Sequence, residues 1–286
     1  MNAVIRRIVS FAGSSVSVEY SGERAAGIVD FLYGSLPITA DTEDPLRVKY
    51  QILPFHESNQ LHLHREGILI YEGNSDAELA DVLLGSTGHD LADRSRSGLL
   101  FHSGALFRGE KGLLLPGGIA AGKTTLTFWL ARRGFNYLTD EMAFLRDGAD
   151  TFQAFTRPLN LKAPSRAVLK NDFDFEGNAS KILSTIVNDL ISPVLLNCNP
   201  PDKEAPLDLL FFPQYRPNSD FILQPLSRAQ AGLELMKCLV NARNLPDHGF
   251  PEITRLARKV PAYRMLYSHF DQIGHRIETI VESSER

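Results

Sequence analysis

The sequence predicts a mixed α/β fold in two parts: a smaller, sheet-rich N-terminal α+β domain over residues 1–92 and an α/β domain over residues 93–286. Short runs of alternating apolar and polar residues, the pattern of half-buried strands, dominate residues 1–72. From Gly98 onward the chain instead alternates apolar strands with amphipathic helices, which is typical of α/β domains. The polar segment 86–94 between these regions predicts the domain boundary.

The N-terminal part is expected to form an antiparallel sheet, because its hydrophobic alternation has a period of two. A short helix is expected over residues 24–33, and Ser75 with Glu78 forms a capping-box pattern that opens a second helix. The expected strands cover residues 15–20, 46–53, 61–64 and 67–71.

Turn and cap signals divide the second part. Asp147-Gly148 predicts a hairpin, and Ser227 with Gln230 forms a second capping box, which opens a helix through Leu239. A looser helical region is expected over residues 165–195. The remaining strands are expected over 99–101, 105–108, 113–116, 135–138, 142–145, 153–155, 207–212, 220–224 and 262–267, and the remaining helices over 125–133, 251–258 and 270–280.

Composition and charge argue against several classes of protein. With 43% hydrophobic and 22% charged residues, the 286-residue chain has the composition of an ordinary globular protein. Its net charge of −4 argues against a nucleic-acid partner held by broad electrostatics. No apolar run reaches the roughly 18 residues of a membrane helix, and the N-terminus lacks a signal-peptide pattern. Cys198 and Cys238 suit neither a disulfide framework nor a zinc site, so we expect free thiols and a cytoplasmic location.

The most informative motif is G-x-x-x-x-G-K-[ST], a phosphate loop that begins at Gly117 and ends at Thr124. An apolar strand precedes it and an amphipathic helix follows it, which is the context that the motif requires. Glycines let the backbone curl so that N–H groups converge on phosphate oxygens, and the helix adds the positive end of its dipole. The sequence therefore predicts a nucleoside triphosphate site. Its expected residues are Gly117, Gly118, Ile119, Ala120, Ala121, Gly122, Lys123, Thr124 and Thr125.

Chemistry at this site needs more than the loop. Lys123 would reach the β- and γ-phosphates, and the Thr124 hydroxyl would hold Mg²⁺. A carboxylate near the γ-phosphate could position metal or accept a proton from the attacking group. The pair Asp140-Glu141, which begins 17 residues after the loop lysine, is the best candidate. It follows a strand expected to neighbour the strand of the loop, and ligands gather at the carboxyl ends of strands.

A histidine completes the pattern. His102 lies 15 residues before Gly117, and by this spacing alone a packed histidine is the simpler interpretation. With the loop and the acidic pair, however, the run His102–Glu141 resembles the catalytic domain of HPr kinase/phosphorylase, a bacterial serine kinase family related in fold to the nucleotide core of phosphoenolpyruvate carboxykinase. In that family a His-Gly precedes the loop, and an acidic pair follows the loop lysine, at about the same intervals.

The resemblance implies an ATP- and Mg²⁺-dependent kinase. By it, Asp140 would be the general base that accepts the proton of a serine hydroxyl, and Glu141 would help to bind metal together with Thr124 and Asp140. His102 would lie near the transferred phosphate or orient Asp140. The family forms hexamers, so the resemblance also implies a homo-oligomer.

Several positions depart from the family pattern. Glu141, Thr124 and Ser103 stand where the family has Asp, Ser and Gly. Ala120 replaces a glycine inside the loop, and we expect it to keep ordinary backbone angles, so that the inner curve of the loop differs. The family's Glu-x-Arg-Gly-x-Gly signature, tied to its phosphorylase activity, is replaced by Thr156-Arg-Pro-Leu-Asn-Leu-Lys162. That pattern is similar to divergent HPr-kinase-related proteins, so neither phosphorylase activity nor HPr as substrate is carried over.

Other residues allow two interpretations each. Arg157 could contact phosphate through its forked guanidinium, or it could form a solvated basic pair with Lys162. His62 and His64 share one strand face, as metal ligands could, but no companion ligand has a convincing spacing. The aromatic run 211–215 could stack on a nucleobase, or it could lie in the core as most phenylalanines do.

The function expected from these residues is an ATP- and Mg²⁺-dependent kinase that phosphorylates a hydroxyl group, a serine for preference, of a protein or peptide. Two alternatives stay open. A small-molecule kinase would use the same site with an enclosed acceptor pocket. A nucleotide-sensing protein would bind ATP without transfer, while the N-terminal sheet docks a peptide by edge-strand addition. The expected partners are a nucleoside triphosphate and a hydroxyl acceptor, without nucleic acid or membrane.

Overall fold

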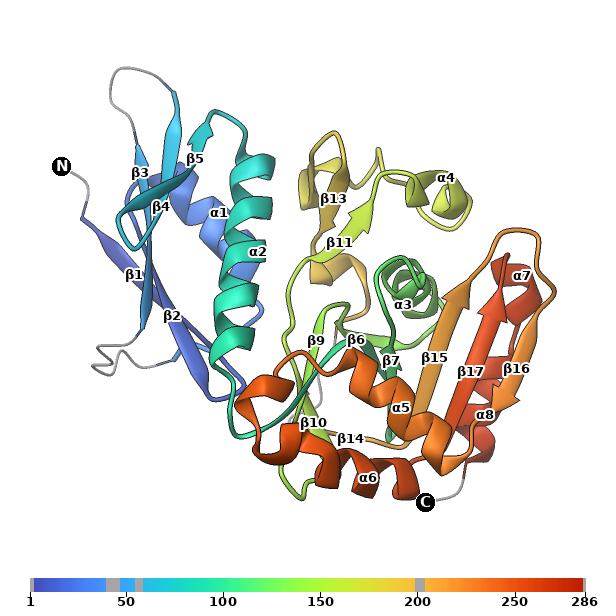
Figure 1. Cartoon of the computed structure of the whole chain (residues 1–286). Coiled ribbons are helices and arrows are strands. Elements are labelled where there is room, and N and C mark those ends of the chain that lie inside the picture. Colours follow the sequence, from blue (N-terminus) through green and yellow to red (C-terminus); the bar gives the residue numbers. More distant parts are fainter. Residues whose placement is uncertain (1–2, 40–46, 55–58, 199–203, 285–286) are drawn as a thin grey trace. The chain divides into compact units, whose positions relative to one another are not determined.

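The computed structural model confirms the mixed α/β class, with several sheets and helices along the chain (Figure 1). It describes residues 3–39, 47–54, 59–198 and 204–284.

The chain forms two compact units. The first unit comprises Met1–Ser95 and Thr156–Pro193, and the second unit comprises Arg96–Phe155 and Val194–Arg286. The sequence predicted one boundary, between residues 92 and 93. The first break in the structure lies close to it, but segment 156–193, which the sequence assigned to the second domain, is grouped with the first unit.

The described residues of the first unit contain a five-stranded sheet in the order β1-β2-β3-β4-β5. Neighbouring strands run antiparallel as predicted, except β2 and β3, which are parallel because helix α1 connects them. Strand β1 lies outside the runs that the sequence singled out. The elements are β1 (Ile5–Phe11), β2 (Ser14–Tyr20), α1 (Glu23–Tyr33), β3 (Val48–Pro54), β4 (Leu61–Arg65), β5 (Ile68–Gly73) and α2 (Asp76–Arg94).

Helix α2 begins at the predicted cap. The Ser75 side chain accepts a hydrogen bond from the Glu78 N–H, at 3.2 Å. The Ser75 N–H donates to the Tyr71 hydroxyl at 3.2 Å, so this tyrosine supplies the contact that the capping-box pattern assigned to the Glu78 carboxylate. The helix then continues to Arg94 through the polar segment that the sequence read as a boundary.

Segment 156–193 contains three short strands, and beyond Leu169 it has only brief 3-10 helical turns, so the helix predicted over residues 165–195 is wrong beyond Leu169. Its three strands pair antiparallel in the order β11-β13-β12. The side-chain amides of Asn160 and Asn188 both donate to Asp81 Oδ1 of α2, at 3.0 and 2.9 Å, and these bonds tie the segment to the first unit. The elements are β11 (Leu159–Lys162), α4 (Ser165–Leu169), β12 (Ile182–Ser184) and β13 (Asn188–Ile191).

The described residues of the second unit form a nine-stranded sheet with the path β14-β10-β9-β6-β7-β15-β17-β16, and β8 pairs with β6. The capping box at Ser227 is present as predicted. The strands are β6 (Gly98–Arg108), β7 (Lys111–Pro116), β8 (Asn136–Thr139), β9 (Met142–Arg146), β10 (Thr151–Ala154), β14 (Ala205–Pro206), β15 (Leu209–Tyr215), β16 (Ile222–Pro225) and β17 (Ala262–Tyr267). The helices are α3 (Lys123–Ala131), α5 (Arg228–Cys238), α6 (Phe250–Lys259), α7 (Phe270–Ile273) and α8 (Arg276–Ser283).

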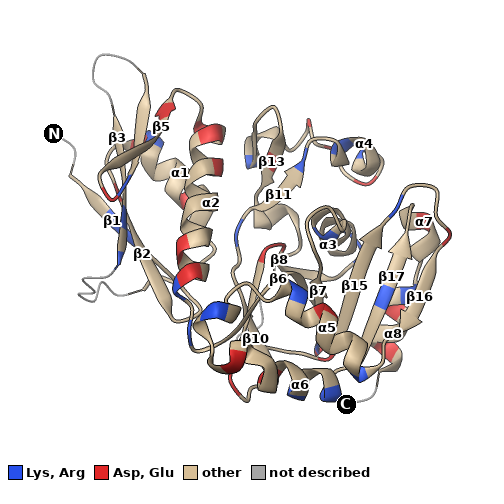
Figure 2. Cartoon of the chain, viewed as in Figure 1, with Lys and Arg blue, Asp and Glu red and all other residues tan. Residues whose placement is uncertain are grey.

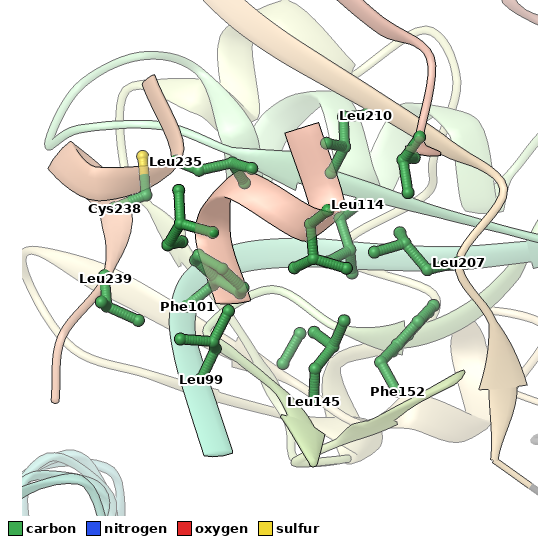
Figure 3. Close-up of a cluster of buried hydrophobic side chains, with 14 of the residues drawn as sticks. Leu99, Phe101, Leu114, Leu145, Phe152, Leu207, Leu210, Leu235, Cys238 and Leu239 are labelled. Atoms are coloured by element: carbon green, nitrogen blue, oxygen red, sulfur yellow. The ribbon is translucent and has the colours of Figure 1, made fainter. Parts of the chain in front are cut away.

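A hydrophobic core holds this sheet against helices α5 and α6 (Figure 3). Phe101 of β6, Leu114 of β7 and Leu210 of β15 are fully buried in it, together with Leu235 of α5. Because these strands are the ones that support the phosphate loop, the core fixes the positions of their ends.

Strand β6 organises the site. On one edge it pairs with β7, and on its other edge β8 and β9 follow one another, antiparallel to it. Asp140 and Glu141 occupy the gap between β8 and β9. The sequence predicted that the strand before the acidic pair would neighbour the strand of the loop. This is wrong, because β6 lies between β8 and β7.

Two general expectations, on the thiols and on a membrane helix, can be compared with the structure. Cys198 and Cys238 are free as predicted, and burial raises the pKa of each thiol to about 11. In the part of the chain that the structure describes, no helix has both the length and the apolar run needed to cross a membrane. Basic and acidic side chains are interspersed along the elements (Figure 2).

Candidate functional site at the phosphate loop

The phosphate loop leaves the end of β7 after Pro116 and enters helix α3 at Lys123. Gly122 caps the helix with φ 87° and ψ 9°, a left-handed conformation that glycine adopts without steric cost. By helix geometry, the N–H groups of the first turn of α3 point out of its N-terminal end, where the helix dipole is positive. The local structure is thus the strand, loop and helix that the motif requires.

Helix α3 approaches β6 closely at Gly104. A Cβ atom at this position would lie 2.3 Å from Thr127 Oγ1 of the helix. Real atoms do not come so close, so a glycine is needed at 104 for α3 to lie where it does.

Ala120 has φ 63°, in the left-handed region. The expectation that it would keep ordinary backbone angles is therefore wrong, because the alanine adopts a strained left-handed conformation. We attribute the left-handed conformation of Ala120 to tertiary contacts, because the next two residues are hydrogen-bonded to other strands. The Ala121 carbonyl accepts from the Tyr215 N–H at 3.1 Å, and the Gly122 carbonyl accepts from the Tyr267 hydroxyl at 3.2 Å.

Replacing Ala120 with glycine is expected to stabilise the second unit. A left-handed conformation costs a non-glycine residue roughly 1–2 kcal/mol, partly offset by the larger entropy that glycine loses on folding. We expect a net gain of up to about 1 kcal/mol in the free energy of unfolding. Urea unfolding followed by fluorescence measures it, because Trp129, the single tryptophan, is buried in α3. The matched control is Ala121→Gly, whose φ is not positive and which should lower stability. An equal loss in both variants would contradict the strain.

Lys123 is buried and folded back on the loop. Its Nζ donates to the carbonyls of Gly117 and Gly118, at 2.8 and 2.9 Å. The positive charge therefore sits inside the curve of the loop, where a phosphate group would need it.

The strand register brings the acidic pair near the end of β7, where the phosphate loop begins. Ser103 of β6 lies opposite Pro116 of β7, and on its other side its N–H donates to the Glu141 carbonyl at 3.0 Å. Two strand spacings, roughly 10 Å, therefore separate the backbone of Glu141 from the residue before the loop. His102, the residue before Ser103 in β6, pairs with Met142. The strand register thus places His102 and the acidic pair beside Ser103, which lies opposite the residue before the loop.

The two carboxylates have different surroundings. Asp140 is only 1% exposed, and the Tyr137 hydroxyl donates to its Oδ1 at 3.2 Å. Glu141 is partly exposed, and its Oε1 lies 3.4 Å from Nδ1 of His102, which is also partly exposed. Thr139 fixes the backbone of the acidic pair, because its hydroxyl accepts from the Glu141 N–H and donates to the Phe155 carbonyl.

Arg157 belongs to the first unit and is buried, so the solvated pair with Lys162 is wrong for Arg157. Its contact with phosphate stays a prediction. In the aromatic run, Phe211 and Phe212 are buried in the core, which agrees with the interpretation of the run as a core strand. Tyr215 is exposed.

Sequence reasoning missed the contacts that Tyr215 and Tyr267 make with the loop. Both tyrosines end strands that run parallel to each other in the sheet, and aromatic residues at such strand ends were the available signal. Within the described residues, no group of three or more His, Cys, Asp or Glu side chains could hold a metal ion, and this includes the surroundings of His62 and His64.

Comparisons with known proteins find only a distant structural similarity. No family model matches the chain, and no curated protein matches it. Among solved structures, the chain is similar to the HPr(Ser) kinase/phosphatase from Coxiella burnetii, with 14% sequence identity over 64% of this chain and 93% of that chain, at a TM-score of 0.31. A likeness at this level carries no argument about activity, which must come from the site itself.

Proposed function

We propose that this protein is an ATP- and Mg²⁺-dependent kinase that transfers the γ-phosphoryl group of ATP to a hydroxyl group, a serine for preference, on a protein or peptide. One observation carries the proposal. The residue before the phosphate loop and the acidic pair both lie beside Ser103, on opposite sides of strand β6. Phosphoryl transfer requires a loop that binds the phosphates and a carboxylate close to it.

In this proposal the loop binds the triphosphate. The N–H groups at the start of α3 and the Lys123 ammonium contact phosphate oxygens, with Lys123 exchanging the carbonyls of Gly117 and Gly118 for the ligand. These positive groups lower the cost of the charge that develops on the leaving ADP. Thr125, in the same first turn, stays a predicted contact.

Asp140 acts as the general base. It takes the proton of the acceptor hydroxyl, the hydroxyl oxygen forms a bond to the γ-phosphorus, and the bond from the γ-phosphorus to the bridging oxygen breaks to release ADP. Burial of Asp140 supports this role, because bulk water then competes poorly with the acceptor. Tyr137 orients the carboxylate through its hydrogen bond, and His102 lies near the transferred phosphate.

The donor set suits Mg²⁺. The Thr124 hydroxyl and the carboxylates of Asp140 and Glu141 are hard oxygen ligands. Mg²⁺ is usually held by one or two carboxylates together with substrate phosphates, so a cluster of three protein ligands is not required. When bound, the ion would neutralise phosphate charge.

Incubation with γ-radiolabelled ATP, Mg²⁺ and two acceptor mixtures tests the proposal. One mixture contains the products of neighbouring genes, and the other contains small hydroxyl compounds. We expect label on a serine of a protein, located by mass spectrometry. Label confined to a small compound would make the protein a small-molecule kinase. Tight ATP binding without transfer in either mixture would favour nucleotide sensing.

A further inference from the structure

Tyr215 is the exposed member of an otherwise buried aromatic run. Phe211 and Phe212 pack in the core, whereas Tyr215, the last residue of β15, is 46% exposed. Large aromatic rings are usually covered, and a ring left open beside a ligand site can bind a flat group.

The tyrosine lies directly against the phosphate loop. Its N–H donates to the Ala121 carbonyl at 3.1 Å, and a Cβ at Gly122 would lie 3.0 Å from the Tyr215 Cβ. Strand β15 runs parallel to β7, with Leu209 and Leu210 opposite Leu113 and Leu114, so both strands end at the same edge of the sheet. Tyr215 therefore stands beside the turn from which helix α3 begins.

The strand order gives the ligand a direction. On one side of β7 lies β6, with the acidic pair on the far side of β6, and on the other side of β7 lies β15 with Tyr215. A nucleoside triphosphate is a linear molecule with its γ-phosphate at one end and its base at the other. If the γ-phosphate faces Asp140, the base extends to the opposite side of the loop, over the end of β15.

The ring is held in place by a second tyrosine. Tyr267 packs edge-on against Tyr215, with ring centroids 5.9 Å apart and an interplanar angle of 67°. Tyr267 is buried, and burial raises the pKa of its hydroxyl well above the ordinary value, so the hydroxyl keeps its proton and donates to the Gly122 carbonyl. A ring fixed in this way loses little entropy when a ligand stacks on it.

We propose that Tyr215 is the platform on which the base of the nucleotide stacks. The inference rests on the proposed function, because it takes the direction of the ligand from the phosphate loop and Asp140. Stacking uses the face that every base possesses, so Tyr215 supports binding of ATP and GTP alike and does not choose between them.

Calorimetric titration with Mg-ATP, Mg-GTP and Mg-tripolyphosphate tests the inference, because tripolyphosphate has the phosphates without the base. Tyr215→Ala is expected to weaken binding of both nucleotides about tenfold, within the range measured for one stacked base. Binding of tripolyphosphate should not change. Tyr215→Phe keeps the ring and should bind like the wild type. The matched control is Phe250→Ala, since Phe250 is 62% exposed on α6 of the same unit.

Two outcomes would overturn the inference. An equal loss for tripolyphosphate and ATP would mean that Tyr215 shapes the loop rather than holding the base. No loss for either nucleotide would mean that the base lies elsewhere. Failure of the proposed function has other signatures. Wild-type protein that binds neither ATP nor tripolyphosphate would contradict both proposals. If Tyr215→Ala binds nucleotides tenfold more weakly but the wild-type protein never transfers phosphate, the kinase proposal fails and the stacking proposal stands.

Discussion

Substitution of Asp140 by asparagine is expected to slow phosphoryl transfer by more than about a hundredfold, the usual scale for a lost general base. Asparagine has the same shape, and its amide oxygen can still accept the bond from the Tyr137 hydroxyl, so the fold of the site should persist. What is lost is the ability to take a proton. ATP affinity measured without Mg²⁺, where the role of Asp140 as a metal ligand does not enter, should therefore change little. The two effects are separated by measuring single-turnover transfer and this ATP binding on the same preparation.

Asp208→Asn is the matched control for this variant. Asp208 lies in the same unit, and its Oδ2 accepts from the Gly112 N–H at 3.0 Å, near the start of β7 rather than at the phosphate loop. It should transfer phosphate at the wild-type rate. Transfer that survives in Asp140→Asn but is lost in Glu141→Gln would contradict the assigned base and move that role to the more exposed carboxylate.

Replacement of Lys123 by methionine is expected to weaken ATP binding at least about a hundredfold. Each hydrogen bond from a charged group contributes about 1.5–3 kcal/mol, and the ammonium would make contacts with two phosphates. Methionine keeps the length of the side chain but has no charge and no donor. Tripolyphosphate binding should fall by a similar factor, because the loss concerns phosphate contacts and not the base.

The exposed Lys237 of α5 provides the control, since it pairs at 3.2 Å with Glu234 one turn away and lies on the surface. Lys237→Met should bind ATP normally. Because Lys123 also bonds to two loop carbonyls, the fluorescence of Trp129 must show that the methionine variant is still folded. A folded Lys123→Met protein with unchanged ATP affinity would mean that the loop does not bind phosphate in the manner proposed.

Much of the fold could be predicted because its signals are local. The caps at Ser75 and Ser227 and the alternation in β2, β3 and β4 depend on residues a few positions apart. The misassigned parts depend on distant partners. Segment 156–193 belongs with the first unit through bonds to Asp81, whose amide donors are 79 and 107 residues away along the chain. No local pattern contains that information.

The candidate site shows the same division. The loop, the acidic pair and His102 could be predicted as one site because a motif and two sequence intervals relate them. The strain at Ala120 was not predictable, because it follows from bonds to the loop made by Tyr215 and Tyr267, which lie far along the chain. The relative burial of Asp140 and Glu141 could not be predicted either, since it depends on the break between β8 and β9 against β6.

The most direct test is a crystal structure of the protein with Mg²⁺ and a non-hydrolysable ATP analogue. We expect the phosphates in the curve of the loop against Lys123. The Asp140 carboxylate should lie within hydrogen-bonding reach, about 2.6–3.2 Å or one water, of the position from which an acceptor oxygen attacks the γ-phosphorus. A bound analogue whose terminal phosphate points away from both Asp140 and Glu141, out of reach of either carboxylate, would contradict the kinase assignment.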